Sequence, residues 1–292
     1  MIKKAIIPIA GLGTRFLPLS KAIPKEFLPL ADKPSIQYII KEAKDSGIEE
    51  IIFVLRQNNK KILEYLKPCR ETERILKEKK KQDILEELEV LKNLCQDLTF
   101  TYVSQKNPAG DGHAVLQAAK NIRSEPVACM FADDIFEARE PVVSQLANIF
   151  KTCQKPVIGL SFQPDNKISA YGAVEIEKIA NKLYKIKKIV EKPKKEEAPS
   201  NLAVVGRYVL TPEVFHYLKK AKPNKNGEII LADVFENHML KEGKLIYGYE
   251  FSGQWLEVGD KAKWLKSNLY FSLKHPKYGP ELKEYLRQIR PY

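Results

Sequence analysis

Runs typical of β-strands alternate with runs typical of α-helices through the first half of the chain. Ile36, Ile39 and Ile40 fall on one face at helical spacing, and Gly47 follows as a helix-ending residue. This order predicts a parallel sheet wrapped by helices. Strands are expected at residues 5–9, 50–55, 98–104 and 126–132, and helices at 35–46 and 113–122.

The second half carries shorter strand-like runs and extends the same sheet. Residues 70–94 are highly charged with spaced leucines, which predicts one or two surface helices inserted between strands and a candidate oligomer surface. No linker or repeat divides the chain. We therefore expect a single α/β domain with a mixed, mostly parallel central sheet flanked by helices. The remaining strands are expected at 171–177, 182–190, 202–210 and 244–251, and the helices at 212–219, 231–242 and from 260 onward.

The composition is that of a packed soluble protein, because 44% of the 292 residues are hydrophobic and 29% are charged. The apolar run at the start is short and meets Pro8 and Gly11, which fits neither a signal peptide nor a membrane span. We therefore expect a cytoplasmic protein with no membrane partner. The four cysteines and four histidines are scattered, without a zinc or disulfide pattern, and Cys129 is expected to be buried in a strand.

The formal net charge of +12 is compatible with nucleic acid, a membrane surface or small polyanions such as nucleotides. Lysines in runs such as 74–81 are mixed with glutamates, and aromatic residues do not alternate with basic ones as in RNA-binding surfaces. We interpret the charge as a solvated basic surface that attracts phosphates, and we expect no nucleic acid partner.

A glycine-rich turn follows the first strand directly. Gly11 and Gly13 allow backbone amides to face a ligand without interference from a Cβ, so a phosphate group is a candidate ligand. The dinucleotide fingerprint GxGxxG fails because Phe16 occupies the third glycine position, and the Walker pattern is absent. A tight strand-to-helix turn remains the alternative interpretation.

Basic residues are spaced along the segment after this turn. Arg15, Lys21 and Lys25 are interrupted by Pro18 and Pro24, which disfavour a helix. We expect an extended, ordered basic loop that is suited to a triphosphate.

Several motifs in this chain resemble those of the sugar-phosphate nucleotidyltransferase family, in particular its bacterial UTP:glucose-1-phosphate uridylyltransferase branch. The first is GLGTRFLPLSKAIPKEFLPLADKP at residues 11–34. The others, in order, are QKNPAGDGHAVLQA at 105–118, FADDIF at 131–136, AYGAVEI at 170–176, IVEKPK at 189–194 and APSNLAVVGRYVLTPEVF at 198–215. The resemblance therefore extends over most of the chain.

The resemblance implies one Rossmann-like domain, with a nucleotide-binding half at 1–135, a sugar-phosphate-binding half at 136–275 and a C-terminal helical tail at 276–292. It implies transfer of a uridylyl group from UTP to glucose 1-phosphate, giving UDP-glucose and pyrophosphate. Mg²⁺ is the expected cofactor, because charge accumulates on two polyanions held in line. The family also commonly forms homodimers or homotetramers.

The same resemblance assigns roles to residues of the nucleotide half. Gln105 and Gly110 match the family positions that read the uracil ring, and Gly110 would leave room for the base. The alternative for Gln105 is an ordinary surface residue at the end of a strand. Lys25 would reach the phosphates near the reaction centre, and Ala10 would floor the nucleoside pocket. The expected nucleotide-binding set is Ala10, Gly11, Gly13, Thr14, Arg15, Lys25, Gln105 and Gly110.

In the sugar-phosphate half, Glu191 would accept hydrogen bonds from sugar hydroxyls and Lys192 would bind the phosphate. Gly172 and Gly206 match backbone positions that the sugar approaches closely. Without the family, Glu191 and Lys192 would be a charge pair at a strand end. The expected catalytic set is Arg15, Lys25, Asp133 and Lys192.

Asp133 follows an apolar strand at the edge where α/β folds collect ligands, and the resemblance makes it a metal ligand. Where the family has a second acid, usually aspartate, this chain has Glu257, which we also assign to the metal. We interpret Asp134 as a helix cap and Asp260 as the N-cap of the last long helix.

Three alternative functions stay open from the sequence. A thymidylyl- or cytidylyltransferase would share the opening motif. A non-catalytic paralogue that binds sugar nucleotides would have less need of Arg15, Lys25, Asp133 and Lys192 together. A nucleic-acid-binding protein would show affinity that depends strongly on salt.

Overall fold

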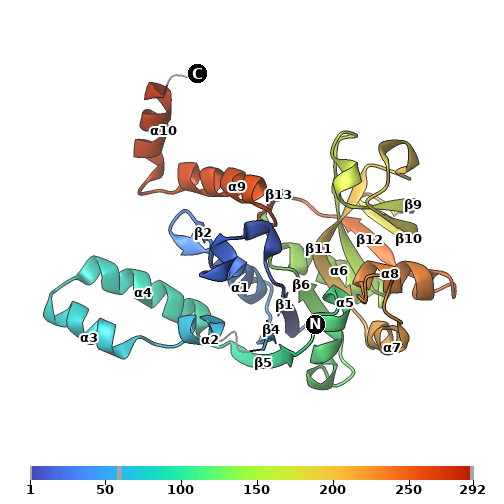
Figure 1. Ribbon diagram of the computed structural model, residues 1–292, viewed down its shortest axis with the longest axis horizontal. Helices are drawn as coiled ribbons and strands as arrows, with labels where there is room; N and C mark the ends of the chain where they lie inside the picture. The colour runs from blue at the N-terminus through green and yellow to red at the C-terminus, as the bar shows by residue number, and fades with distance from the viewer. Residues whose placement is uncertain (1, 58–60, 290–292) are drawn as a thin grey trace.

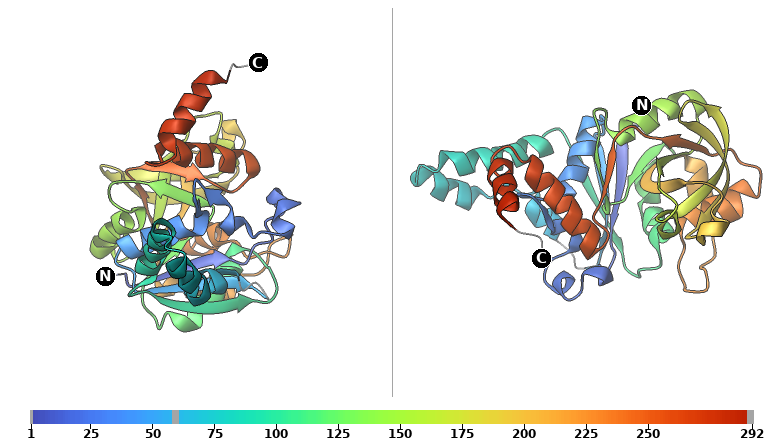
Figure 2. Two further views of the ribbon diagram at one scale, coloured as in Figure 1. Left: turned by 90° about the vertical axis from the view of Figure 1, so that its left-hand side faces the viewer. Right: turned by 90° about the horizontal axis from the view of Figure 1, so that it is seen from above.

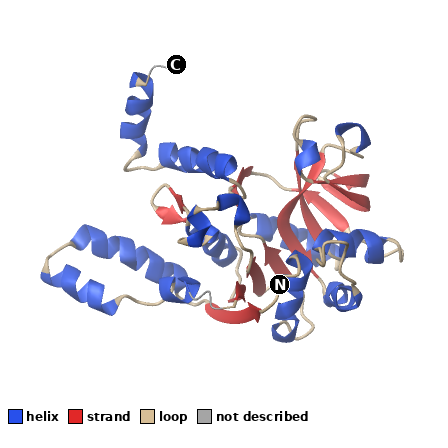
Figure 3. Cartoon of the chain, in the orientation of Figure 1, coloured by secondary structure: helices blue, strands red, loops and turns tan. Residues whose placement is uncertain are grey.

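The computed structural model describes residues 2–57 and 61–289, and its centre is a nine-stranded sheet (Figures 1 and 3). The strand order is β5-β4-β1-β6-β11-β8-β12-β10-β9. These strands are β1 (Lys4–Ile9), β4 (Glu50–Arg56), β5 (Thr99–Gln105), β6 (Val127–Met130), β8 (Val157–Phe162), β9 (Gly172–Ala180), β10 (Leu183–Glu191), β11 (Leu202–Leu210) and β12 (Tyr247–Glu250). Two small ribbons pair β2 (Pro29–Leu30) with β3 (Lys33–Pro34) and β7 (Asp134–Glu137) with β13 (Gln254–Glu257).

Strand direction confirms the mixed, mostly parallel sheet that the sequence predicts. β5, β4, β1 and β6 are parallel neighbours, as are β8 and β12. Within the described residues, β11 and β10 are the strands of this sheet that pair antiparallel with their neighbours on both sides. Because β1, β4, β5 and β6 run the same way, the segments after them emerge at one edge of the sheet.

Helices cover both faces of the sheet, because alternate residues of each buried strand point to opposite sides. Ile7 of β1 packs in one core cluster with Ile36 and Ile39, whereas Ile6 packs in another with Val115. The helices are α1 (Ser35–Asp45), α2 (Lys61–Tyr65), α3 (Arg70–Glu78), α4 (Gln82–Cys95), α5 (Asp111–Gln117), α6 (Val142–Cys153), α7 (Pro212–Lys220), α8 (Leu231–Val234), α9 (Lys261–Lys274) and α10 (Gly279–Gln288).

The inserted segment forms two helices, α3 and α4, that project away from the sheet as a hairpin (Figures 1 and 2). At the other end of the chain, α9 packs on β2 and β13, and α10 packs on α9. Helix α10 lies within the expected C-terminal tail at 276–292, of which residues 290–292 lie outside the described part of the chain. No helix among the described residues has both the length and the apolar character needed to cross a bilayer.

Three local expectations are corrected by the structure. The basic loop is not extended; it folds into 3₁₀ turns at Thr14–Phe16, Leu19–Lys21 and Lys25–Phe27. The second and third turns follow Pro18 and Pro24, because the fixed φ of proline suits the start of such turns. The helix after Leu231 changes to a π-helix at Phe235–Leu240. Asp134 caps no helix, because it opens strand β7. Cys129 is buried in β6 and Asp260 is the N-cap of α9, both as expected.

Candidate active site

The glycine-rich turn lines a cavity of about 350 Å³ at the carboxyl end of β1. Gly13 has φ +63, and its carbonyl accepts hydrogen bonds from the Phe16 amide at 2.9 Å and the Ser20 hydroxyl at 2.8 Å. Glycine is required there because a Cβ would lie 3.2 Å from Cβ of Ser20 in a left-handed conformation. Gly11 and Lys25 line the same cavity. The turn and Lys25 therefore share one concave surface.

Ser20 and Arg56 are among the polar residues that line this cavity, and sequence reasoning missed both. Ser20 holds the turn closed, and Arg56 ends β4 directly beside it. Arg56 follows a buried parallel strand in the same way as Gln105 does, so its place at a strand end was the available signal.

Lys25 forms an ion pair with Asp133, which lies between β6 and β7. The Asp133 carbonyl accepts a hydrogen bond from the Val258 amide at 2.8 Å, which ties the end of β13 to this point. A Cβ on Gly259 would lie 3.6 Å from Oδ2 of Asp133 and 3.7 Å from NH1 of Arg15. The structure thus brings Arg15, Lys25 and Asp133 together, with Lys25 and Asp133 only partly exposed.

The predicted base-reading residues lie at the carboxyl end of β5 and the start of α5. Gln105 is buried, and its Nε2 donates to the Gly110 carbonyl at 3.2 Å and lies 2.8 Å from Nδ1 of His113. Burial argues against the alternative that Gln105 is an ordinary surface residue. Gly110 has φ +95, and a Cβ there would lie 2.4 Å from the Ile229 carbonyl oxygen. The group that approaches Gly110 closely is therefore the backbone of Ile229.

On the sugar-phosphate side, Gly172 and Glu191 are cross-strand neighbours of β9 and β10. A Cβ on Gly172 would lie 3.1 Å from Oε2 of Glu191. Lys192 has φ +46, its amide donates to the Tyr171 carbonyl at 3.0 Å, and its Nζ lies 3.5 Å from Oε1 of Glu191. The exposed, charged side chains of Glu191 and Lys192 thus form one corner with the buried Gly172.

Gly206, the remaining predicted sugar contact, is buried beside Asp134. Its amide donates to Oδ2 of Asp134 at 3.0 Å, and a Cβ there would lie 2.2 Å from that oxygen. Trp255 Nε1 donates to Oδ1 at 2.7 Å. Desolvation by burial raises the pKa of Asp134 to about 6, although Arg207 acts to lower it. Asp134 is therefore part of a buried network that the sequence did not reveal.

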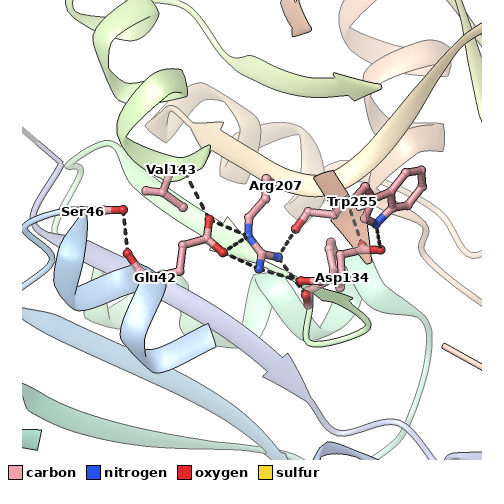
Figure 4. Close-up of polar contacts among 8 residues, drawn as sticks. Glu42, Ser46, Asp134, Val143, Arg207 and Trp255 are labelled. Carbon is pink, nitrogen blue, oxygen red and sulfur yellow. Dashed lines mark hydrogen bonds and ion pairs between the residues drawn. The ribbon is translucent and has the colours of Figure 1, made fainter. Parts of the chain in front are cut away.

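Arg207 joins that network to the nucleotide half (Figure 4). Its side chain is fully buried; Nε donates to both carboxylate oxygens of Glu42 at 3.1 Å, and NH2 donates to Oε2 at 2.8 Å. NH2 also donates to the Asp134 carbonyl at 2.7 Å. A fork-shaped guanidinium can satisfy all of these acceptors at once.

Asp111, the first residue of α5, is a second, partly exposed acid that sequence reasoning missed. Its Oδ1 accepts hydrogen bonds from the Gly112 amide at 2.5 Å and the Leu231 amide at 2.9 Å. Desolvation raises its pKa to about 6, those two bonds act to lower it, and Glu191 adds to the rise. Asp111 thus links the start of α5 to α8.

Glu257 ends β13, and its side chain is engaged by Lys263 and Tyr171. Its Oε1 accepts from Lys263 Nζ at 2.6 Å, and its Oε2 accepts from the Tyr171 hydroxyl. The described residues contain no group of three or more His, Cys, Asp or Glu side chains placed to hold a metal ion. The two predicted metal ligands each pair with a lysine: Asp133 with Lys25 and Glu257 with Lys263.

Comparison with known proteins gives a consistent result. The family model described as nucleotidyl transferase matches residues 4–271. A UTP--glucose-1-phosphate uridylyltransferase of Staphylococcus haemolyticus is 41% identical over 288 residues, covering 99% of this chain and 98% of that protein. A solved UTP-bound UGPase from Acinetobacter baumannii has a TM-score of 0.89 at 35% identity, covering 99% of this chain and 100% of the other. A UDP-glucose pyrophosphorylase complexed with UDP-glucose has a TM-score of 0.84 at 36% identity, covering 94% and 100%.

Proposed function

This chain belongs to the nucleotidyl transferase family, and from that membership we propose that it transfers a uridylyl group from UTP to glucose 1-phosphate. The products are UDP-glucose and pyrophosphate. The observation that carries this function is a site with two separate cationic parts. Lys25 and Arg15 lie beside the glycine-rich turn and Asp133, and Lys192 lies with Gly172 and Glu191.

The chemistry requires that two polyanions meet in line. A phosphate oxygen of glucose 1-phosphate attacks the α-phosphorus of UTP, and the bond to the pyrophosphate oxygen breaks. The nucleophile is already ionised at neutral pH, so no general base is needed and the protein contributes positioning and positive charge. We assign the triphosphate to Gly11, Gly13, Thr14, Arg15 and Lys25, uracil to Gln105 and Gly110 above Ala10, and the sugar phosphate to Gly172, Glu191, Lys192 and Gly206.

Nucleotidyltransferases generally use a divalent metal ion, and we propose Mg²⁺ for this chain. The Asp133 carboxylate fits the ion, because it is a partly exposed hard oxygen donor beside the triphosphate cavity. When bound, Mg²⁺ would neutralise charge on the phosphates. The Lys25 ammonium holds the Asp133 carboxylate in place and stays within reach of the same phosphates.

The decisive test supplies the purified protein with glucose 1-phosphate, Mg²⁺ and UTP, dTTP or CTP in turn, and measures pyrophosphate release. We expect the highest kcat/KM with UTP. Faster turnover with dTTP or CTP would replace uridylyl transfer by one of the alternative nucleotidyl transfers. No pyrophosphate with any of the three would favour a non-catalytic protein that binds sugar nucleotides.

We further propose a homodimer or homotetramer. Leu265 and Leu269 on α9 and Leu286 on α10 are exposed apolar side chains on neighbouring helices, which supports burial against another copy. Sedimentation equilibrium should give a dimer or tetramer mass, and a monomer at micromolar concentration would contradict the proposal.

A further inference from the structure

Both oxygens of the Glu257 carboxylate are engaged by hydrogen-bond donors. Lys263 Nζ donates to Oε1 at 2.6 Å, and the Tyr171 hydroxyl donates to Oε2. Lys263 Nζ also lies 3.4 Å from the Tyr171 hydroxyl oxygen and 4.8 Å from the centroid of its ring. The Glu257 side chain is 20% exposed and that of Lys263 33%. Partial burial makes these charged contacts stronger than those of a surface pair.

Glu257 lies opposite Asp134 in the β7–β13 ribbon. Its neighbour on the same face, Trp255, donates to the Asp134 side chain. Asp133 precedes β7, and its side chain pairs with Lys25 on the nucleotide side. Glu257 is thus engaged by Lys263 and Tyr171 on the Asp134 side of the ribbon, whereas Asp133 is engaged by Lys25.

Tyr171 connects Glu257 to the residues that we assign to the sugar phosphate. It directly precedes Gly172, and its carbonyl accepts the hydrogen bond from the Lys192 amide at 3.0 Å. Its ring lies 5.0 Å from the ring of Trp255. A tyrosine held at its hydroxyl, its ring and its carbonyl fixes the backbone on which Gly172 and Lys192 lie.

We propose that Glu257, Lys263 and Tyr171 form a clamp between the start of α9 and the sugar-phosphate corner, and that Glu257 is a positioning residue and not a metal ligand. The clamp rests on the proposed function. It acts through Tyr171 on Lys192, so it governs binding of glucose 1-phosphate and leaves UTP and the divalent ion unaffected.

Steady-state kinetics of Lys263→Met and Tyr171→Phe test the clamp. Each variant loses one charge-assisted hydrogen bond to Glu257, so KM for glucose 1-phosphate should rise about five- to tenfold, with KM for UTP within about twofold of the parent. Lys266→Met is the matched control. Lys266 is exposed on the same helix and lines a cavity together with Tyr171, Glu257 and Lys263, but it forms no ion pair with Glu257 in the described part of the chain. It should behave as the parent. Unchanged KM for glucose 1-phosphate in both clamp variants would overturn the proposal.

Manganese binding separates a clamp from a metal ligand. Titration of free Mn²⁺ by electron paramagnetic resonance, in the presence of saturating UDP-glucose, should give the parent affinity for Glu257→Gln and Glu257→Asp, and a large loss for Asp133→Asn. Glu257→Asp should still raise KM for glucose 1-phosphate, because the shorter side chain does not span Lys263 and Tyr171 together. Loss of Mn²⁺ binding in Glu257→Gln as large as in Asp133→Asn would overturn the inference.

Calorimetric titration with glucose 1-phosphate separates failure of the clamp from failure of the proposed function. A parent protein that binds glucose 1-phosphate without releasing pyrophosphate would contradict the function alone. Lys263→Met and Tyr171→Phe variants that bind glucose 1-phosphate as tightly as the parent would contradict the clamp alone. A parent that binds no glucose 1-phosphate would contradict both.

Discussion

Lys192 carries the positive charge of the corner, formed with Gly172 and Glu191, that we propose to bind the sugar phosphate. Its exposed side chain lies beside Glu191, and its left-handed backbone is held by Tyr171. Lys192→Ala should raise KM for glucose 1-phosphate about tenfold or more and lower kcat, because one charge-assisted contact to the phosphate is lost. Lys194→Ala, two residues further along, is the control and should change neither constant by more than about twofold. Parent-like kinetics of Lys192→Ala would remove Lys192 from the site.

Asp134 predicts a pH dependence of stability. Its pKa is raised from 3.8 to about 6 in the folded protein, first by burial. The folded state therefore binds the proton more tightly than the unfolded state, so this contribution is present below pH 4 and is lost as the pH rises toward 6. The free energy of unfolding of the parent, relative to Asp134→Asn, should fall across that window in urea titrations.

Asp134→Asn should also lower the free energy of unfolding by about 1–3 kcal/mol near neutral pH. The NH2 group of the new side chain would face either Trp255 Nε1 or the Gly206 amide, and both of these groups are hydrogen-bond donors.

Asp165→Asn is a control in which the pH dependence of stability has the opposite sign. The hydrogen bond from Asn201 holds the pKa of the exposed Asp165 below its usual value, so its contribution is lost as the pH falls. A parent that gains stability relative to Asp134→Asn between pH 4 and 6 would contradict the prediction.

At the scale of elements, the start of α5 is packed against the segment before α8 with no room for a side chain. Gly110→Ala would combine φ +95 with a Cβ 2.4 Å from the Ile229 carbonyl oxygen. We expect a loss of about 2–5 kcal/mol in the free energy of unfolding, from left-handed strain and overpacking together. Gly227→Ala is the matched control, because Gly227 has φ +77 with no heavy atom within 4 Å. It should lose only about 1–2 kcal/mol.

Urea denaturation measures both glycine variants. Equal losses would show that strain alone governs Gly110 and that the approach of Ile229 is relieved by a small shift of α8. A larger loss for Gly110→Ala would show that overpacking against Ile229 adds to the left-handed strain.

At the scale of the whole molecule, we propose that residues 1–135 and 136–275 form one domain that unfolds as a unit. The Glu42–Arg207 pair supports this, because α1 belongs to the first half and β11 to the second. Glu42 also accepts a hydrogen bond from the Val143 amide of α6 at 3.3 Å. The two halves are thus joined by a buried charged group as well as by the continuous sheet.

Glu42→Gln should lower the free energy of unfolding by about 3 kcal/mol or more, because it leaves the buried guanidinium of Arg207 without its counter-charge. Asp45→Asn removes the exposed i,i+4 partner of Lys41 on the same helix and should cost less than about 0.5 kcal/mol. Both are measured by urea denaturation followed by tryptophan fluorescence and circular dichroism. Two separate transitions in the parent would contradict a single domain.

What the sequence by itself determined was local. The alternation of strands and helices, the apolar face of α1 and the polar residues at strand ends follow from periodicities within about 10–20 residues, and the structure has each of them. The 3₁₀ turns of the basic loop were missed because proline was interpreted only as a breaker of helices, although its φ also favours such turns.

Only the tertiary structure decided which charged residues meet. Arg207 and Glu42 are 165 residues apart, Trp255 and Asp134 are 121 apart, and Tyr171 and Glu257 are 86 apart. Each contact depends on the register of distant strands and on which face of a short ribbon points inward, which no local pattern encodes. For the same reason Asp134 and Glu257 took roles in the folded chain that their neighbours in the sequence did not indicate.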